Sequence, residues 1–432
     1  MFRIASVICL LLISIISINA SVAEACTILT AKQDDIVLFG NNEDYTDKNS
    51  IIWFYNTPFT DLIDFSHAPY RYMMVGRYID NGLNHQSIDS QSWQLGINEH
   101  GLVIDGNSLE SYPMDRHPEK KYSHNGIGLF ASILGECKTV DDVIGLIAEI
   151  DFSPSMVYQI MVADAFGDAM VFSPGSDGEI KITRKTGDGY LISTNTNREI
   201  SDEKLRSTDK RYALTAEMLD RYNSEEQLIV ENFVSILDRV HVEGVELNTD
   251  FSTVIDLKSL EINLSYFHQF EEVVTFNLID ELSMGNHEYV IQDLFSKQIV
   301  EDAENEQRMY FLKLYISLSI LLISSLALIV YLIIQTRKHI RLNELRGKNK
   351  IILIGRKFVI GLFGVLLYII DFFIITILFI ASNDAQLGYI IEFEANIGFP
   401  YFIRIISGLS FGMAFYLIVI YFSRRSMEYQ LQ

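Results

Sequence analysis

Cys26 stands where cleavage of an export signal would leave it as the first residue of the mature chain. Residues 1–25 have the pattern of a signal peptide, with one basic residue, an apolar run and the small-x-small ending Ala-Glu-Ala. Cleavage after Ala25 would give Cys26 a free α-amine beside its thiol. The two groups ordinarily titrate near ~8 and ~8.5, so the amine can accept the thiol proton. The sequence therefore predicts a complete nucleophile–base unit on one residue.

Four later polar residues lie at the ends of strand-like runs or at the start of a helix-like run. A hairpin would return Asp44 to Cys26, where its carboxylate could orient the α-amine. Asn107 and Asn195 each follow an apolar run, and neutral side-chain amides are suitable donors to an oxyanion. Arg211 opens a helical pattern. Taken singly, each of these residues is equally typical of a turn or a helix cap.

Five short motifs nevertheless occur in order along the chain. They are Cys-Thr after the signal peptide, Gly-Asn-Asn-Glu-Asp at 40–44, Asn-Glu-His-Gly-Leu at 98–102, Thr-Asn at 194–195 and Asp-Lys-Arg-Tyr at 209–212. Together they resemble the choloylglycine hydrolase family of N-terminal-nucleophile hydrolases. That family includes bile salt hydrolases, penicillin V acylases and the related acid ceramidases and N-acylethanolamine amidases. The resemblance covers about residues 26–297 and implies an α+β fold, a four-layer αββα sandwich.

The resemblance also implies a role for each candidate residue. Cys26 would be the nucleophile with its own amine as base, Asp44 would orient that amine, and Arg211 would support the electrostatics of the nucleophile. Asn195 and Asn107 would donate hydrogen bonds to the tetrahedral oxyanion. The implied reaction is attack on a linear amide carbon, release of the amine and hydrolysis of the resulting thioester.

One position departs from the family pattern. Bile salt hydrolases and acid ceramidases usually have Arg three residues before the aspartate, where this chain has Asn41. Asn41 cannot supply that positive charge, so the resemblance does not extend to the substrates of those enzymes. We expect no cofactor. The nine histidines show no His-Glu-x-x-His spacing, so we also expect no catalytic metal.

Three long apolar runs in the last third of the chain predict transmembrane helices. The loop between the first two is basic, and the loop between the last two is acidic before Arg404. This bias places the C-terminus in the cytoplasm and the first domain outside. The expected order is signal peptide 1–25, hydrolase domain 26–297, polar linker 298–313, transmembrane helix 314–334, basic cytoplasmic loop 335–357, transmembrane helix 358–381, acidic external loop 382–404, transmembrane helix 405–422 and cytoplasmic tail 423–432.

The exported segment carries most of the acid of a chain whose formal net charge is −22. Such a charge argues against a nucleic-acid partner. The expected partners are signal peptidase, membrane lipid and a small or lipid-like N-acyl amide substrate. Cys137 lies in a helix-like stretch, and we expect it to be a small buried residue, although a pair with Cys26 is the alternative.

Hydrophobic periodicity predicts the elements of the exported domain. The expected strands are 27–31, 36–40, 94–97, 102–105, 157–164, 169–173, 180–185, 190–193, 252–257, 260–264 and 272–278. The expected helices are 126–134, 140–150, 209–222 and 226–240.

Two other interpretations of the chain stay open at this point. A lipid could acylate Cys26, which would block the amine. A binding or sensor protein could keep the hydrolase fold without turnover, which would fit three membrane helices and Asn41. Asp371 within the second apolar run is a candidate functional residue by its position alone.

Overall fold

The computed structural model of the 432-residue chain describes residues 26–45, 48–56, 70–78, 91–123, 126–185, 187–224, 227–244 and 247–310, with residues 312 and 334. The chain forms two compact units. The first comprises Met1–Val242 and Glu246–Ala303, and the second comprises Glu243–Val245 and Glu304–Gln432. The predicted signal peptide lies outside the described residues.

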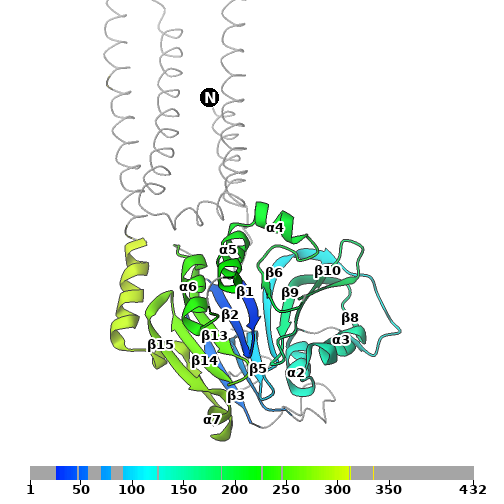
Figure 1. Ribbon diagram of the computed structural model, residues 1–432, viewed down its shortest axis with the longest axis horizontal. Coiled ribbons are helices and arrows are strands. Elements are labelled where there is room, and N and C mark those ends of the chain that lie inside the picture. The colour runs from blue at the N-terminus through cyan, green and yellow to red at the C-terminus, as the bar shows by residue number, and fades with distance from the viewer. Residues whose placement is uncertain are drawn as a thin grey trace, which may run out of the picture. The chain divides into compact units, whose positions relative to one another are not determined.

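Two antiparallel sheets make up the first unit (Figure 1). The first sheet has the strand order β12 (Tyr190–Ser193), β1 (Thr27–Gln33), β2 (Ile36–Tyr45), β13 (Asn248–Asp256), β14 (Glu261–Tyr266) and β15 (Gln269–Asn277). The second has the order β11 (Ile180–Arg184), β10 (Ala169–Pro174), β9 (Ser155–Ala163), β6 (Val103–Pro113), β5 (Gln91–Asn98), β4 (Tyr72–Tyr78), β3 (Ile51–Tyr55) and β16 (His287–Val290). The short strands β7 (Tyr122–Ser123) and β8 (Ile150–Asp151) form a separate parallel pair.

Helices cover the outer face of each sheet (Figure 1). Against the first sheet pack α5 (Lys210–Ser224) and α6 (Val230–Val240), and α5 is preceded by α4 (Asp202–Thr208). Against the second packs α2 (Gly126–Glu136), followed by α3 (Val140–Ala148). The short helices α7 (Leu278–Ser283) and η2 (Ile291–Leu294) flank β16.

Three hydrophobic clusters fill the three interfaces of this arrangement. Ile28 and Phe54 belong to the cluster between the sheets. Leu29 and Phe233 belong to the cluster between the first sheet and its helices. The third lies between the second sheet and α2 and α3. The order helix, sheet, sheet, helix confirms the predicted αββα sandwich.

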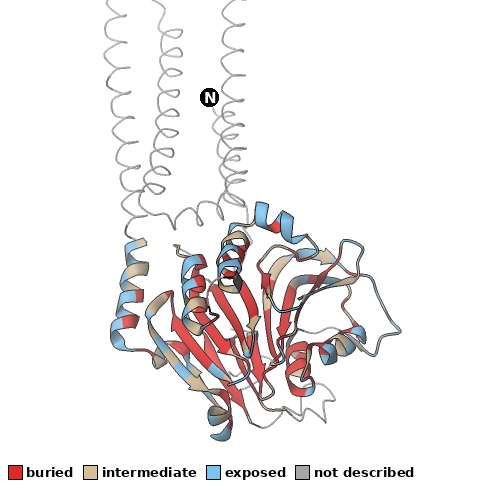
Figure 2. Ribbon diagram, viewed as in Figure 1, coloured by how far each residue is buried: buried red, intermediate tan, exposed pale blue. Residues whose placement is uncertain are grey.

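The two faces of each central strand are therefore both covered, and Figure 2 shows the strands largely buried. In β1, Ile28 points between the sheets while its neighbour Leu29 points at the helices, as the two-residue period of a strand requires. A strand buried on both faces shows a nearly continuous apolar run in the sequence. This is why residues 27–31 and 36–40 were recognisable as strands.

Every expected element is present, but several bounds are different. All eleven expected strands and four expected helices have counterparts. The last expected strand ends at Asn277 instead of Leu278, because the Asn277 side chain accepts the backbone N–H of Ile279 and caps α7. Strands β3, β4, β7, β8 and β16 and helices α4 and α7 were not predicted. The α4 segment buries only Leu205 and so has no apolar period to reveal it.

The predicted membrane segments are not covered by these observations. Among the described residues, no helix is long and apolar enough to cross a membrane. The spans 314–334, 358–381 and 405–422 lie outside the described residues apart from Ile334, and Asp371 lies outside them too. Within the second unit residues 304–310, predicted as linker, are helical, and the Tyr310 hydroxyl donates a hydrogen bond to Glu243.

Candidate active site

Polar side chains replace apolar ones in part of the layer between the sheets. On the inward faces of β1, β2 and β6, the apolar residues Ile28, Phe39 and Val103 belong to the intersheet core. Because every second residue of a strand points to the same face, the next inward-facing positions along these strands can be identified, and they are polar. These are Cys26, Asn41, Glu43, Asp105 and Asn107, each at most 1% exposed. Strand alternation thus gathers a polar group inside an otherwise apolar layer.

Cys26 is held through its backbone carbonyl. The Asn107 side-chain amide donates to that oxygen at 3.2 Å, and the Arg211 guanidinium donates to it at 2.9 Å. Burial raises the pKa of the Cys26 thiol well above its ordinary value, and Glu43 and Asp44 raise it further. A hydrogen bond from the Asp44 backbone N–H acts in the opposite direction. In the uncleaved chain the thiol is therefore protonated at neutral pH.

Asp44 lies beside this residue, as the hairpin of β1 and β2 requires. Thr27 pairs with Asn42 across the two strands, so the next pair outward is Cys26 with Glu43, and Asp44 follows directly. The Asp44 side chain is fully buried and accepts a hydrogen bond from the Thr249 hydroxyl. Burial raises the pKa of Asp44 to about 7, while Arg211 and the Thr249 hydrogen bond oppose that shift.

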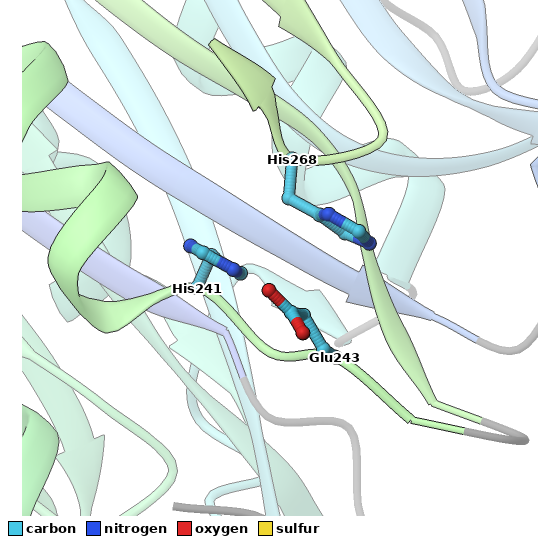
Figure 3. A group of neighbouring side chains, drawn as sticks. All are labelled: His241, Glu243 and His268. Atoms are coloured by element: carbon cyan, nitrogen blue, oxygen red, sulfur yellow. The ribbon is translucent and has the colours of Figure 1, made fainter. Parts of the chain in front are cut away.

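A stacked pair of histidines includes His241, which acts electrostatically on Asp44. His241 exerts a smaller lowering effect on the pKa of Asp44. Its ring stacks on that of His268, with centroids 5.1 Å apart and planes 9° apart (Figure 3). Glu243, which is also drawn in Figure 3, belongs to the second unit.

Arg211, at the start of α5, connects the other candidate residues. Besides the carbonyl of Cys26, it donates to the Thr27 hydroxyl at 3.1 Å and to the Asn195 side-chain oxygen at 3.2 Å. Its Nη1 also lies 3.8 Å from an Asp44 carboxylate oxygen. One guanidinium therefore touches three of the other candidate residues, which is possible because it carries five donors in a fixed plane.

The two asparagines come from different sheets. Asn195 follows β12 and donates to the backbone carbonyl of Ser108 on β6 at 3.1 Å. The Asn107 side-chain oxygen accepts a hydrogen bond from the Ser193 hydroxyl. Gln159 on β9 supports this region through donation to the Ser193 hydroxyl at 3.2 Å. The structure thus brings all five predicted site residues into one connected group.

Three buried members of the group were not predicted from the sequence. Glu43 and Asp105 both act on the thiol electrostatically, and both raise the pKa of Cys26. Gln159 binds the backbone of residues 194 and 196 at 2.6 and 3.0 Å and so shapes the loop that presents Asn195. The signal that could have found the two acids is their even spacing along the strand from an inward-facing apolar residue, four residues after Phe39 for Glu43 and two after Val103 for Asp105.

Cys137 and Asn98 prove to be structural. Within the described residues both Cys26 and Cys137 are free thiols, so the alternative of a disulfide between them is wrong. Cys137 is buried at the end of α2, and burial raises its pKa to about 12. Asn98 donates to the carbonyls of Leu134 and Cys137 at 2.8 Å each. Residues 99–101 form the turn between β5 and β6, in which Gly101 has a φ of +77°.

A fold of two helix-covered antiparallel sheets, with a cysteine at the edge of the first strand, defines the N-terminal-nucleophile class. A sequence profile described as acyl-coenzyme A:6-aminopenicillanic acid acyl-transferase matches residues 30–254, more than half of the chain. The chain belongs to this family, which is related to the choloylglycine hydrolases and penicillin V acylases. The resemblance inferred from the motifs is confirmed.

Solved structures with a similar arrangement include two variants of the conjugated bile acid hydrolase from Clostridium perfringens. They are 14% and 15% identical to the chain, with TM-scores of 0.47 and 0.44, and each alignment covers 61% of this chain and 96% of theirs. A penicillin V acylase from Agrobacterium tumefaciens is 16% identical with a TM-score of 0.42, and the alignment covers 56% of this chain and 82% of the acylase. No curated protein matches the chain.

Proposed function

We propose that the chain is a hydrolase of linear amide carbon–nitrogen bonds that works from Cys26 at a newly formed N-terminus. The observation that carries this proposal is the way Cys26 is held. Asn107 and Arg211 both bind its carbonyl, so the residue that would bear the thiol and the amine is fixed in place. Asp44 lies next to it and is linked to the same guanidinium. A structural cysteine would need none of these contacts.

Cleavage after Ala25 is the proposed activating step. In the uncleaved chain burial and the nearby carboxylates keep the Cys26 thiol protonated. Cleavage frees an α-amine that can accept the thiol proton, and the positive charge of the resulting α-ammonium offsets those carboxylates and so favours the thiolate. The buried carboxylate of Asp44 would hold this amine. The chain is thereby inert as a precursor and reactive after export.

Attack then follows from the geometry. The thiol proton moves to the α-amine, and the sulfur forms a bond to the amide carbon while the carbonyl electron pair moves to oxygen. The side-chain amides of Asn195 and Asn107 would donate to this oxyanion. Each amide uses one N–H on a backbone carbonyl, of Ser108 and Cys26 respectively, and each has a second N–H to offer.

Breakdown of the intermediate completes the reaction. The carbon–nitrogen bond breaks, the leaving nitrogen takes the proton from the α-ammonium, and a thioester on Cys26 remains. Water then gives a proton to the α-amine and attacks the thioester carbon. The sulfur–carbon bond breaks, and the thiolate takes its proton back from the α-ammonium. Arg211 would keep the Cys26 backbone in the same position during both acylation and deacylation.

We further propose that the domain is tethered at the outer face of a membrane. The support is the sequence, in which a signal-peptide pattern precedes the domain and three apolar runs follow it, with basic residues between the first two. An active site held near lipid favours an N-acyl compound with an apolar acyl chain. Cleavage by signal peptidase during export would then be the activating step.

The second candidate function is a membrane-bound binding protein that keeps the fold without turnover. The favouring observation is the charge around Cys26. Asn41 is neutral and accepts a hydrogen bond from the Thr253 hydroxyl, and burial together with the nearby acids raises the pKa of the Cys26 thiol. If the α-amine does not offset those acids, the thiol stays protonated and the chain binds amides without cleaving them.

A burst experiment separates these two functions. The full chain, purified from membranes in detergent, is mixed with an N-acyl p-nitroanilide, and nitroaniline release is followed with time. The hydrolase predicts a burst close to one equivalent per active chain, which is absent in Cys26→Ala and retained in Cys137→Ala. Binding without release in the wild type would favour the binding protein. Release that survives Cys26→Ala would overturn the hydrolase mechanism.

A further inference from the structure

Asn195 lies in a segment that depends on neighbouring side chains for its position. Residues 194–197 follow β12 and belong to no strand or helix. A group that stabilises a transition state must be held within about 0.5 Å of its working position, and a loop gives this precision only with support from its surroundings. Gln159 supports the segment through the carbonyls of Thr194 and Thr196. A second support comes from the start of α5.

Asp209 binds the two hydroxyls that flank Asn195. Its Oδ2 accepts a hydrogen bond from the Thr194 hydroxyl at 2.6 Å and another from the Thr196 hydroxyl at 2.9 Å. Hydrogen bonds to a carboxylate are shorter and stronger than those between neutral groups. Because the two bonds reach both neighbours of Asn195, they fix the backbone from which the Asn195 side chain extends.

The other oxygen of the same carboxylate fixes the start of α5. Asp209 Oδ1 accepts the backbone N–H of Tyr212 at 3.0 Å, which is the hydrogen bond of a helix N-cap. Arg211, the second residue of α5, binds the Asn195 side-chain oxygen at 3.2 Å and the Cys26 carbonyl at 2.9 Å. A cap needs only one oxygen. The two bonds from the other oxygen to the loop therefore indicate a second role.

We propose that Asp209 is a positioning residue that fixes Asn195 relative to Arg211. The oxyanion donor and the residue that holds Cys26 then keep one common geometry. This inference rests on the proposed hydrolase function. Asp209 takes no part in the bond changes and acts through Asn195. Loss of its bonds to the loop should therefore weaken the stabilisation of the tetrahedral intermediate and leave the reactivity of the Cys26 thiol unchanged.

Three variants separate this role from the capping of α5. In Asp209→Ser the serine still caps the helix, but its shorter side chain has one oxygen and no second acceptor for the loop hydroxyls. Thr194→Val removes one of those hydroxyls and leaves the Asp209 cap in place. Thr30→Val is the matched control, because Thr30 is also buried and also loses one hydrogen bond, to the Leu38 carbonyl at 2.9 Å within the hairpin of β1 and β2.

The N-acyl p-nitroanilide measures the effect on turnover. We expect kcat to fall about tenfold in Asp209→Ser and in Thr194→Val, because a misplaced donor retains part of the effect of Asn195. KM should change by less than about twofold, and Thr30→Val should keep both constants within about twofold of wild type. Iodoacetamide alkylates Cys26 by displacement of iodide, without an oxyanion. Its rate, followed by peptide mass spectrometry, should be unchanged in all three variants.

A double-mutant cycle tests whether Asp209 acts through Asn195. Asp209→Ser should lower kcat about tenfold in the wild type but about twofold or less in the Asn195→Ala background, because the group that Asp209 positions is then absent. Partial misfolding of the variant, or any other loss unrelated to Asn195, would give the same factor in both backgrounds. The ratio of the two factors is therefore specific for the positioning role.

The outcomes separate this inference from the proposed function. The same loss in both backgrounds would overturn the role of Asp209 while the hydrolase function stands. A wild-type kcat in both Asp209→Ser and Thr194→Val would do so as well, and so would an alkylation rate that falls as far as kcat. If the wild type alkylates at Cys26 but releases no nitroaniline, the hydrolase function fails, and the role of Asp209 fails with it.

Discussion

The buried carboxylate of Asp44 gives a prediction about stability whose sign and size follow from its pKa. In the uncleaved chain that pKa is raised from 3.8 to about 7, chiefly by burial. Between these values the unfolded chain has lost the Asp44 proton while the folded chain keeps it. Folding stability must therefore fall as pH rises from about 4 to 7. A shift of about 3 units corresponds to about 4 kcal/mol.

Substitution of Asp44 by Asn removes this dependence, because the amide does not ionise in this range and can still accept the Thr249 hydrogen bond. In chains that retain Ala25, we expect Asp44→Asn and wild type to be about equally stable at pH 4. At pH 8 we expect the variant to be more stable by up to about 4 kcal/mol, or about 10 °C in Tm.

Tryptophan fluorescence is a suitable assay for this comparison. The chain has two tryptophans, Trp53 on β3 and Trp93 on β5, and both lie in the first unit. Thermal unfolding followed at these residues therefore reports on the sandwich alone, even in the full chain in detergent. A difference in Tm that is the same at pH 4 and pH 8 would refute the reasoning. So would a wild type that gains stability over the variant as pH rises.

Three further substitutions give distinct expected results. Arg211→Leu removes the hydrogen bonds to Cys26 and Asn195, so the rate at which an electrophilic probe labels Cys26 should fall at least about a hundredfold. Arg211→Lys should recover only part of this rate. Equal labelling rates in wild type and Arg211→Leu would contradict the positioning role. Asn195→Ala should lower kcat about 10²–10³-fold with little change in KM, as measured by steady-state kinetics, and a pure KM effect would argue against an oxyanion donor. Gly101→Ala should lower Tm by several degrees, because the new Cβ would lie 2.2 Å from the Leu257 carbonyl oxygen and residue 101 has a φ of +77°. An unchanged Tm in the fluorescence assay would show that the turn relaxes.

The strands and helices could be predicted from the sequence because they depend on local patterns, whereas the four-layer arrangement and the roles expected for the five candidate site residues rest on the motif resemblance. Apolar runs revealed the central strands, and the polar residues that follow them mark the site. Strands β3 and β4 were not predicted, although residues 51–55 are almost entirely apolar and buried. A five-residue apolar run does not by itself distinguish strand from loop, and pairing with β4 and β16 decides it.

The sequence alone could not show that Glu43 and Asp105 lie near Cys26, because the side chains that lie next to Cys26 depend on the register of the strands. An acid within a strand is typical of a solvent-facing position, and both residues are in fact fully buried. Which face a strand buries depends on the layer packed against it, and here both faces are covered. Only the pairing of β1 with β2, and the facing of β6 across the layer, bring these acids to Cys26.

The central claim is that Cys26 becomes an N-terminal nucleophile, and intact-mass measurement with N-terminal sequencing tests it most directly. The protein purified from membranes is measured before and after exposure to an electrophilic amide-hydrolase probe. We predict a chain that begins at an unmodified Cys26 and gains the mass of one probe, with no gain in Cys26→Ala. A chain that retains Ala25, or one that carries a lipid on Cys26, would contradict the claim.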